Sequence, residues 1–378
     1  MTDVIQHLSK RKRKVMDKAY QGAEDFSRHV DFETLTTIVS EEFQLEEALM
    51  EHNVPTYFLK QPQETKTSFL RMLERLEKMD LIAFLRMRDE RMVLKIVPKP
   101  PTKPSNTLIN WVLFFATIAT TFATGFVLSL GLVEKGEMFS PFVGGISFTI
   151  AIMAVLGMHE LGHKFAANKK GVEATPPYFI PGPPPINGFL GIGTFGAVIK
   201  QKSLPPNKDA LFDVGANGPI AGFVLAIVVS IIGLLLSPTY EITGDMNFLP
   251  APLIFELFAT YVVQLPSNHY ILLHPVAFAG WVGMIVTMLN LLPAAMLDGG
   301  HIARSMVGEK ARNILTVVSI LLLIIQGFLP MAIFALFMSM FRHPGPLDDV
   351  SSPSRGRKIL TIVLIAVFVL CSIPRVIF

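Results

Sequence analysis

Uncharged apolar runs alternate with short polar segments from residue 104 to the end of the chain. The runs lie at 104–133, 138–158, 214–240, 257–297, 313–341 and 359–374. A helix that crosses a hydrocarbon core of about 30 Å needs about 20 apolar residues. The pattern therefore predicts a polytopic α-helical membrane protein with about six or seven transmembrane helices. We place them near 108–133, 141–165, 214–237, 275–297 and 359–376, with 313–341 forming either one tilted helix or a pair bent at Gly327–Pro330.

The first hundred residues show a different pattern, in which apolar and charged positions alternate over short distances. Their spacing predicts one or two polar helices, a strand, a helix and a two-stranded hairpin, at 31–52, 54–60, 66–80, 81–87 and 91–97. These elements indicate a small soluble α/β domain over residues 1–97. The Pro-rich stretch 98–107 favours extended backbone and predicts a stiff linker. The membrane domain then spans 108–378.

The distribution of charge narrows the class of protein. The chain has 33 Lys and Arg against 30 Asp and Glu, and more than half of these charges lie in the first 106 residues. This near balance leaves no excess of basic residues that would bind nucleic acid, so we expect no nucleic-acid partner. The single cysteine, Cys371, excludes an intramolecular disulfide. Basic loops between the apolar runs predict, by the positive-inside rule, a multi-pass protein of the cell membrane with a cytoplasmic N-terminal domain.

The sequence HELGH occupies residues 159–163, at the inner end of the second predicted helix. Residues four apart project from one face of a helix, so His159 and His163 can bind one Zn²⁺. Glu160 is turned by about 100° from His159 and can polarise a water molecule bound to the metal. A His-Glu-His cluster beside a long uncharged run is costly in a membrane unless it is paired, metal-bound or hydrated, which favours a functional site.

A zinc hydrolase has three protein ligands and one open position. Asp298 is the strongest candidate for the third ligand. It ends the run 275–297, which as a helix would span about 35 Å and place Asp298 at the depth of the two histidines. A helix-terminating turn with Gly299 and Gly300 is the alternative for this aspartate. Four other candidates are weaker. Glu173 lies in a predicted loop, and His269 and His274 lie on the opposite side of the membrane. His301 is three residues past Asp298 and is better placed to support a ligand residue or to lie at a helix end.

In this order, the motifs resemble the site-2 protease family of intramembrane zinc metalloproteases, over residues 108–310. HELGH matches the family's HExxH, which implies that His159 and His163 are zinc ligands and Glu160 is the general base. LDG at 297–299 matches the second family signature, which implies that Asp298 is the third ligand. Asn290 matches a recurring family asparagine near the active site, which implies a catalytic or substrate-binding role. A hydrogen bond between helices is its alternative.

Further segments fit this resemblance. The glycines of GANGPIAG at 215–222 would let two helices approach closely. FLGIGTFGAVI at 189–199 resembles the family's membrane-embedded β-hairpin or loop. PPYFIP at 176–181, the soluble N-terminal domain and the lack of room for a PDZ domain are typical of the branch shared by prokaryotes and plastids. A plastid copy is expected to begin with a Ser- and Arg-rich transit peptide, which this sequence lacks.

The resemblance implies an intramembrane zinc metalloprotease with one Zn²⁺ per chain and a catalytic core at about 141–300. It would hydrolyse peptide bonds within or near the inner end of transmembrane segments of membrane-protein substrates, as in regulated intramembrane proteolysis. An unwound substrate segment could pair with a strand edge at 191–199, where Gly191, Gly193 and Gly196 would allow close approach. A Gly-rich loop packed beneath the helices is an equal alternative.

The expected partners are transmembrane substrates and the lipid bilayer, and the N-terminal domain is expected to bind a cytosolic or substrate partner. Two other functions compete with proteolysis. A zinc-binding transporter would spread ionisable groups across the membrane depth, but here they cluster at one end. A non-catalytic scaffold would tolerate damage to the motif, but Glu160 and the ligand residues are intact.

Overall fold

The computed structural model describes residues 31–102, 104–186, 191–243, 249–341 and 343–372. These residues form two compact units. The sheet unit consists of residues 31–102 together with the short segments 206–208 and 346–352. The helical unit consists of the other described residues.

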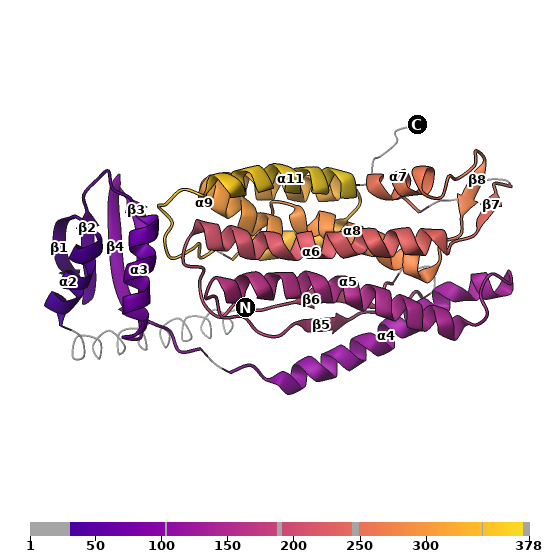
Figure 1. The fold of residues 1–378 in the computed structure, drawn as a ribbon, viewed down its shortest axis with the longest axis horizontal. Coiled ribbons are helices and arrows are strands. Elements are labelled where there is room, and N and C mark those ends of the chain that lie inside the picture. Colours follow the sequence, from indigo (N-terminus) through magenta and orange to yellow (C-terminus); the bar gives the residue numbers. More distant parts are fainter. Residues whose placement is uncertain (1–30, 103, 187–190, 244–248, 342, 373–378) are drawn as a thin grey trace, which may run out of the picture. The chain divides into compact units, whose positions relative to one another are not determined.

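The sheet unit contains a four-stranded antiparallel sheet of order β1-β2-β4-β3, accompanied by two helices (Figure 1). Its elements are α2 (Phe32–Glu42), β1 (Leu45–Glu51), β2 (Val54–Leu59), α3 (Lys66–Glu77), β3 (Leu81–Arg88) and β4 (Arg91–Pro98). Phe69, Met72 and Leu76 of α3 recur at helical spacing and are fully buried. The helix predicted at 66–80 and the hairpin predicted at 81–97 are both present.

One prediction in this unit is wrong. Residues 45–51, expected to be helical, form strand β1. The sequence LEEALME has high intrinsic helix propensity. However, β1 pairs along β2, with Ala48 opposite Tyr57 and Met50 opposite Pro55. Pairing with a neighbouring strand overrides the local propensity, which is a weak influence compared with tertiary contacts.

A segment from the far end of the chain completes the edge of this sheet. Residues 346–352, which we call the return segment, lie beside β3. The backbone N–H of Leu85 donates to the Leu347 carbonyl at 3.0 Å, and the N–H of Asp349 donates to the Leu85 carbonyl at 3.1 Å. Asp348 is fully buried, and its Oδ1 accepts hydrogen bonds from the backbone N–H groups of Val350 and Ser351. The outer edge of β3 is therefore occupied by the protein's own chain, which satisfies backbone groups that an edge strand leaves free.

The helical unit is built from long apolar helices and short strands (Figure 1). In chain order these are α4 (Thr107–Glu134), α5 (Pro141–Lys169), β5 (Tyr178–Pro181), β6 (Thr194–Val198), α6 (Lys208–Leu235), β7 (Thr239–Glu241), α7 (Leu253–Tyr261), β8 (His269–Ile271), α8 (Pro275–Leu291), α9 (Asp298–Ile325), α10 (Leu329–Ser339) and α11 (Arg355–Cys371). The main core gathers buried side chains of α5, α6 and α8, including Phe148, Val155, Ala226 and Met284. The predicted helices near 108–133, 141–165 and 214–237 are present with somewhat extended ends.

One predicted helix boundary is wrong, and another boundary decides between two alternatives. The run 275–297 is not one helix: α8 ends at Leu291, and Asp298 begins α9 instead of ending α8. Pro293 is the physical reason, because the residue before a proline is disfavoured in the helical region. The run 313–341 is a bent pair, since α9 ends at Ile325 and α10 begins at Leu329. Helix α9 is itself broken at Gly308, whose φ of +80° suits a glycine.

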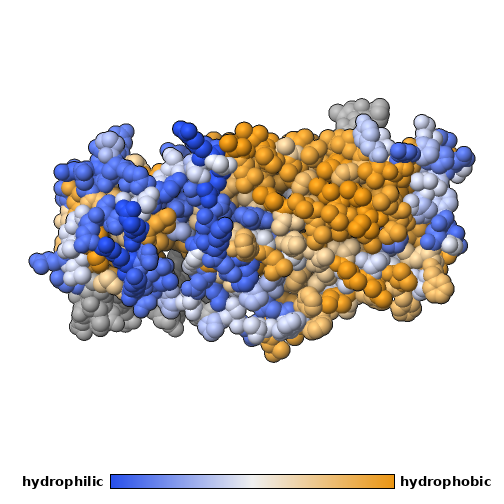
Figure 2. Space-filling view, viewed as in Figure 1, coloured by the Kyte–Doolittle hydropathy of each residue, from blue (hydrophilic) through white to orange (hydrophobic). Residues whose placement is uncertain are grey.

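The surface of the helical unit suits a lipid environment. Three described helices are long and apolar enough to cross a membrane: α4, α5 and α6. Large apolar side chains also cover the face of this unit that Figure 2 shows. Among the exposed apolar residues of the unit, Trp111, Phe165 and Ile362 are all more than half exposed. Apolar exposure on this scale is untypical of a soluble monomer. The protein is therefore associated with a membrane, as the sequence predicts, whereas the predicted total of six or seven crossings stays a prediction.

Candidate metal centre

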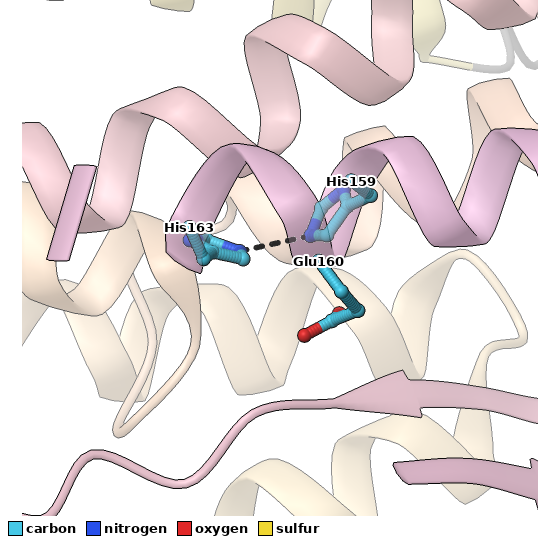
Figure 3. A group of neighbouring side chains, drawn as sticks. All are labelled: His159, Glu160 and His163. Carbon is cyan, nitrogen blue, oxygen red and sulfur yellow. Dashed lines mark hydrogen bonds between the residues drawn. The ribbon is translucent and has the colours of Figure 1, made fainter. Parts of the chain in front are cut away.

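Helix α5 presents both histidines of HELGH to one point (Figure 3). The Nε2 atoms of His159 and His163 lie 3.1 Å apart. Together with a carboxylate oxygen of Glu160, the ligand atoms of these side chains lie within 4.8 Å of one another, and all three residues are buried. In Figure 3 the Glu160 side chain points away from the two rings. Its carboxylate is hydrogen-bonded to the backbone of Ile199, the residue that follows β6.

Asp298 joins this cluster from the start of α9. Its Oδ2 lies 3.2 Å from Nε2 of His159 and 3.2 Å from Nε2 of His163. The two glycines after it allow this position. A Cβ on Gly299 would lie 2.2 Å from the Leu291 carbonyl oxygen, and one on Gly300 would lie 2.4 Å from the Ala295 carbonyl oxygen. The turn with Gly299 and Gly300 and the convergence of Asp298 on the histidines are thus both features of the same segment.

The three converging atoms suit a small tetrahedral metal ion. Ligands about 2.0–2.1 Å from a tetrahedral zinc lie roughly 3.3 Å from one another, close to the separations of Nε2, Nε2 and Oδ2. His163 is also oriented for this role: its Nδ1 lies 2.6 Å from the Val214 carbonyl oxygen, to which it can only donate. That hydrogen bond places the proton on Nδ1 and leaves the Nε2 lone pair directed into the cluster.

The glycines of α6 face the two imidazole rings. A Cβ on Gly218 would lie 2.1 Å from Nε2 of His163, and one on Gly222 would lie 3.0 Å from Nδ1 of His159. The close helix approach predicted at 215–222 is therefore present, and it occurs against the histidines themselves. The sequence did not indicate that these glycines contact the two histidines. It also missed the Val214 carbonyl, for which the sequence carries no signal because every residue has a backbone carbonyl.

Asn290 reaches the cluster from α8. Its Nδ2 lies 3.3 Å from Nε2 of His159, although 131 positions separate the two residues. The structure therefore brings Asn290 together with His159, His163 and Asp298, and the contact is also a hydrogen bond between helices. The interhelical hydrogen bond is the contact that the structure shows, and the catalytic or substrate-binding role of Asn290 stays a prediction.

The weaker candidates make other contacts. His274 caps α8 by accepting a hydrogen bond from the N–H of Val276, and Nδ1 of His269 lies 3.2 Å from the Ser267 carbonyl oxygen. Nδ1 of His301 lies 2.8 Å from Nε2 of His343, a partner that no sequence spacing indicated. Glu173 lies beyond the end of α5, where its backbone carbonyl accepts a hydrogen bond from the N–H of Lys202.

The predicted substrate-binding glycines are not equivalent. Strand β6 pairs with β5, so the partner of 194–198 is the segment YFIP at 178–181; residues 189 and 190 of the predicted hairpin lie outside the described residues. A Cβ on Gly191 would lie 2.3 Å from the Pro183 carbonyl oxygen, and one on Gly193 would lie 2.5 Å from Oγ1 of Thr124. A Cβ on Gly196 would meet no atom within 4 Å. Gly191 and Gly193 pack inside the unit, whereas Gly196 faces open space.

Comparison with known proteins agrees with this geometry. Residues 147–326 of the chain match peptidase family M50, and this region contains HELGH, Asn290 and Asp298. The chain is 31% identical over 251 residues to a protein named probable zinc metalloprotease EGY1, chloroplastic, of Oryza sativa subsp. japonica, covering 63% of this chain and 42% of that relative.

A second relative is matched over a longer stretch. The probable zinc metalloprotease EGY2, chloroplastic, of Arabidopsis thaliana is 28% identical over 307 residues, covering 76% of this chain and 53% of the relative. The chain thus spans about half the length of the curated relatives it matches. No solved structure matches it.

Proposed function

We propose that the chain is a zinc metalloprotease that hydrolyses peptide bonds within or near the inner end of transmembrane segments of membrane proteins. One observation carries the proposal: the Nε2 atoms of His159 and His163 and Oδ2 of Asp298 converge, 3.1 to 3.2 Å apart, between buried helix segments. The match of residues 147–326 to peptidase family M50 and the names of the relatives support zinc as the metal and proteolysis as the reaction. The ionisable groups gather at one place, which argues against an ion pathway.

In this proposal His159, His163 and Asp298 hold the metal, and Glu160 is the general base. When bound, Zn²⁺ supplies Lewis acidity that polarises the scissile carbonyl and makes a water molecule acidic near neutral pH. An oxygen of the Glu160 carboxylate lies within 4.8 Å of the ligand atoms of His159 and His163, so it is near enough to accept a proton from the attacking water and return it to the leaving amine. Asn290 is close enough to hydrogen-bond an oxygen of the reacting group.

The substrate would bind along β6. A helix shields its own peptide bonds, so a transmembrane substrate must unwind before a carbonyl can be attacked. Among the described residues β6 pairs only with β5, which leaves its second edge available for an added strand. Ile199 continues β6 to the Glu160 carboxylate, so a strand paired there would pass the general base. Gly196 supplies the open approach, while Gly191 and Gly193 hold the loop in place.

The remaining proposals concern the protein's surroundings. The apolar flanks of the helical unit would face the lipid bilayer, and we place the sheet unit on the cytoplasmic side of the cell membrane from the distribution of basic residues. The bent pair α9–α10 supports this orientation, because a hairpin returns Arg355 and Arg357 to the side of Lys310. The sheet unit would bind a cytosolic or substrate partner.

The decisive experiment compares the full chain with Glu160→Gln in detergent, using a single-span test substrate and metal analysis. We expect about one zinc per chain in both proteins and cleavage by the wild type only, because Gln keeps the size of the side chain but cannot accept the proton. Cleavage by Glu160→Gln would remove Glu160 from the mechanism. Zinc without wild-type cleavage of any single-span substrate would favour a scaffold, and zinc uptake into proteoliposomes would favour a transporter.

A further inference from the structure

Arg357, at the start of α11, binds two carboxylates of α6. Its Nε donates to Oδ1 of Asp213 at 2.8 Å and its Nη2 donates to Oδ2 of Asp213 at 2.5 Å, across 144 positions of sequence. Its Nη1 lies 3.1 Å from Oδ2 of Asp209. The side chains of Arg357 and Asp213 are only 22% and 19% exposed. Two parallel N–H···O bonds from one guanidinium fix both position and direction, which an ammonium group cannot do.

Asp213 also connects α6 to the helix that carries HELGH. Nζ of Lys170, the residue that directly follows α5, lies 3.0 Å from Oδ2 of Asp213. The ends of α5, α6 and α11 are therefore joined at one carboxylate. The first turns of a helix have unsatisfied N–H groups and tend to fray, and here they are held by groups of two neighbouring helices.

The residue after Asp213 touches the metal centre. The Val214 carbonyl accepts the Nδ1–H of His163 at 2.6 Å, and Gly218, one turn further along α6, lies against the ring of the same histidine. The partner of the second ring nitrogen sets the orientation and the tautomer of a metal-binding histidine. Any shift of the first turns of α6 would therefore rotate the His163 ring or release its Nδ1–H.

We propose that Arg357 is a positioning residue for the metal centre: by holding Asp213 in a two-bond clamp it keeps the Val214 carbonyl against His163. This inference rests on the proposed role of His163 as a metal ligand. No contact between Arg357 and the reacting atoms is needed. The action runs from α11 through the Asp213 side chain to the adjacent backbone carbonyl and then to the imidazole.

The test measures zinc affinity in the full chain, by competition with a chelator of known affinity, for Arg357→Met and Arg357→Lys. Loss of an outer partner typically costs about 10- to 100-fold in metal affinity, and we expect about 10-fold for Arg357→Met because it acts one step further out. Arg357→Lys keeps the positive charge but cannot form the two parallel hydrogen bonds. Its zinc affinity should lie between those of Arg357→Met and the wild type. The visible spectrum of the Co²⁺-loaded protein should change in Arg357→Met as the ligand geometry loosens.

The direction of the effect separates positioning from simple electrostatics. Removal of a positive charge near a cation site would by itself tighten zinc binding, so weaker binding in Arg357→Met supports the positional role. Arg355→Met removes an exposed charge two residues away and should leave zinc affinity unchanged. A double variant of Arg357→Met with Asp213→Asn should bind zinc no more weakly than the weaker single variant, because both break the same link.

The outcomes can be told apart from those of the proposed function. Monodisperse Arg357→Met with wild-type or tighter zinc affinity would overturn the positioning role while leaving proteolysis intact. Additive losses in the double variant would do the same. A wild type that binds zinc but cleaves no substrate would overturn the proposed function alone. A wild type without any zinc affinity would overturn both.

Discussion

Nε2 of His159 lies 3.2 Å from Oδ2 of Asp298, although 139 positions separate the two residues in the chain. Gly299 and Gly300 at the start of α9 allow this contact, because they leave room for the carbonyls of Leu291, at the end of α8, and of Ala295, in the turn that follows. The contact adds a third candidate ligand atom, from α9, to the two histidine nitrogens of α5. A pair of histidines alone would leave a zinc ion with too few protein ligands for a hydrolytic site.

Asp298→Ala should therefore lower the zinc affinity strongly, with a smaller effect on the stability of the fold. Loss of an outer partner of a metal ligand costs about 10- to 100-fold in metal affinity. We expect a larger loss of zinc affinity here, because the proposed function makes Asp298 a direct ligand. Metal analysis after gel filtration measures this directly. Glu173→Gln is the matched control, since Glu173 is the other carboxylate candidate and lies beyond the end of α5, where its backbone N–H donates to Oγ of Ser203 and its carbonyl accepts from the N–H of Lys202. Zinc loss in Glu173→Gln with retention in Asp298→Ala would reverse the ligand assignment.

Gly218→Ala should damage the centre although it adds only one methyl group. The new Cβ would lie 2.1 Å from Nε2 of His163, so either the ring or α6 must move. Overpacking of this kind typically costs about 1–3 kcal/mol in stability. Loss of zinc and of cleavage, measured beside thermal unfolding, is the expected result.

The control for this substitution is Gly131→Ala, in the apolar helix α4. Its Cβ would meet no atom within 4 Å, and alanine is favoured over glycine in a helix by about 0.8–1.0 kcal/mol. We expect unchanged zinc content and equal or higher stability. Equal zinc affinity in Gly218→Ala and Gly131→Ala would show that α6 does not constrain the His163 ring.

Asp348→Ala should release the return segment from β3. The buried carboxylate accepts the N–H groups of Val350 and Ser351, and loss of such an acceptor in a buried place costs about 1–3 kcal/mol. Hydrogen exchange should then accelerate at the amides of Leu85 and Asp349, which bond across the segment. Asp348→Asn retains the carbonyl acceptor and should keep both amides protected. Equal protection in all three proteins would mean that the backbone pairing holds without this side chain.

The sequence alone predicts the parts of this fold that depend on local composition. The apolar length that identifies α4, α5 and α6 is a property of the residues themselves, and the i, i+4 spacing of HELGH fixes which face carries His159 and His163. Asp298 lies beside the two histidines, as its position after the apolar run 275–297 predicts, but this run is not one helix. Pro293 ends α8 early, and the turn that contains this proline carries Asp298 to the start of α9.

The features that the sequence does not predict depend on partners far along the chain. Strand β1 exists because β2 is beside it, and the pairing of β5 with β6 joins two segments of which only one looked like a strand. The return segment on β3 and the bond of His163 to the Val214 carbonyl use backbone groups, which every residue has. No pattern of side chains could have indicated them.

Asn290→Ala should lower cleavage while zinc stays bound. Nδ2 of Asn290 lies 3.3 Å from Nε2 of His159, so the amide is beside the ligand atoms and can donate to an oxygen in the open part of the centre. Removal of one such donor in other hydrolases costs about 100- to 1,000-fold in kcat, and a loss of this order is expected here, with KM changed little. Thr287→Val, on the same helix, is the control, because the Thr287 hydroxyl donates to the Gly283 carbonyl within α8. Zinc loss in Asn290→Ala that equals its loss of cleavage would instead make Asn290 a support for His159, without a part in the reaction.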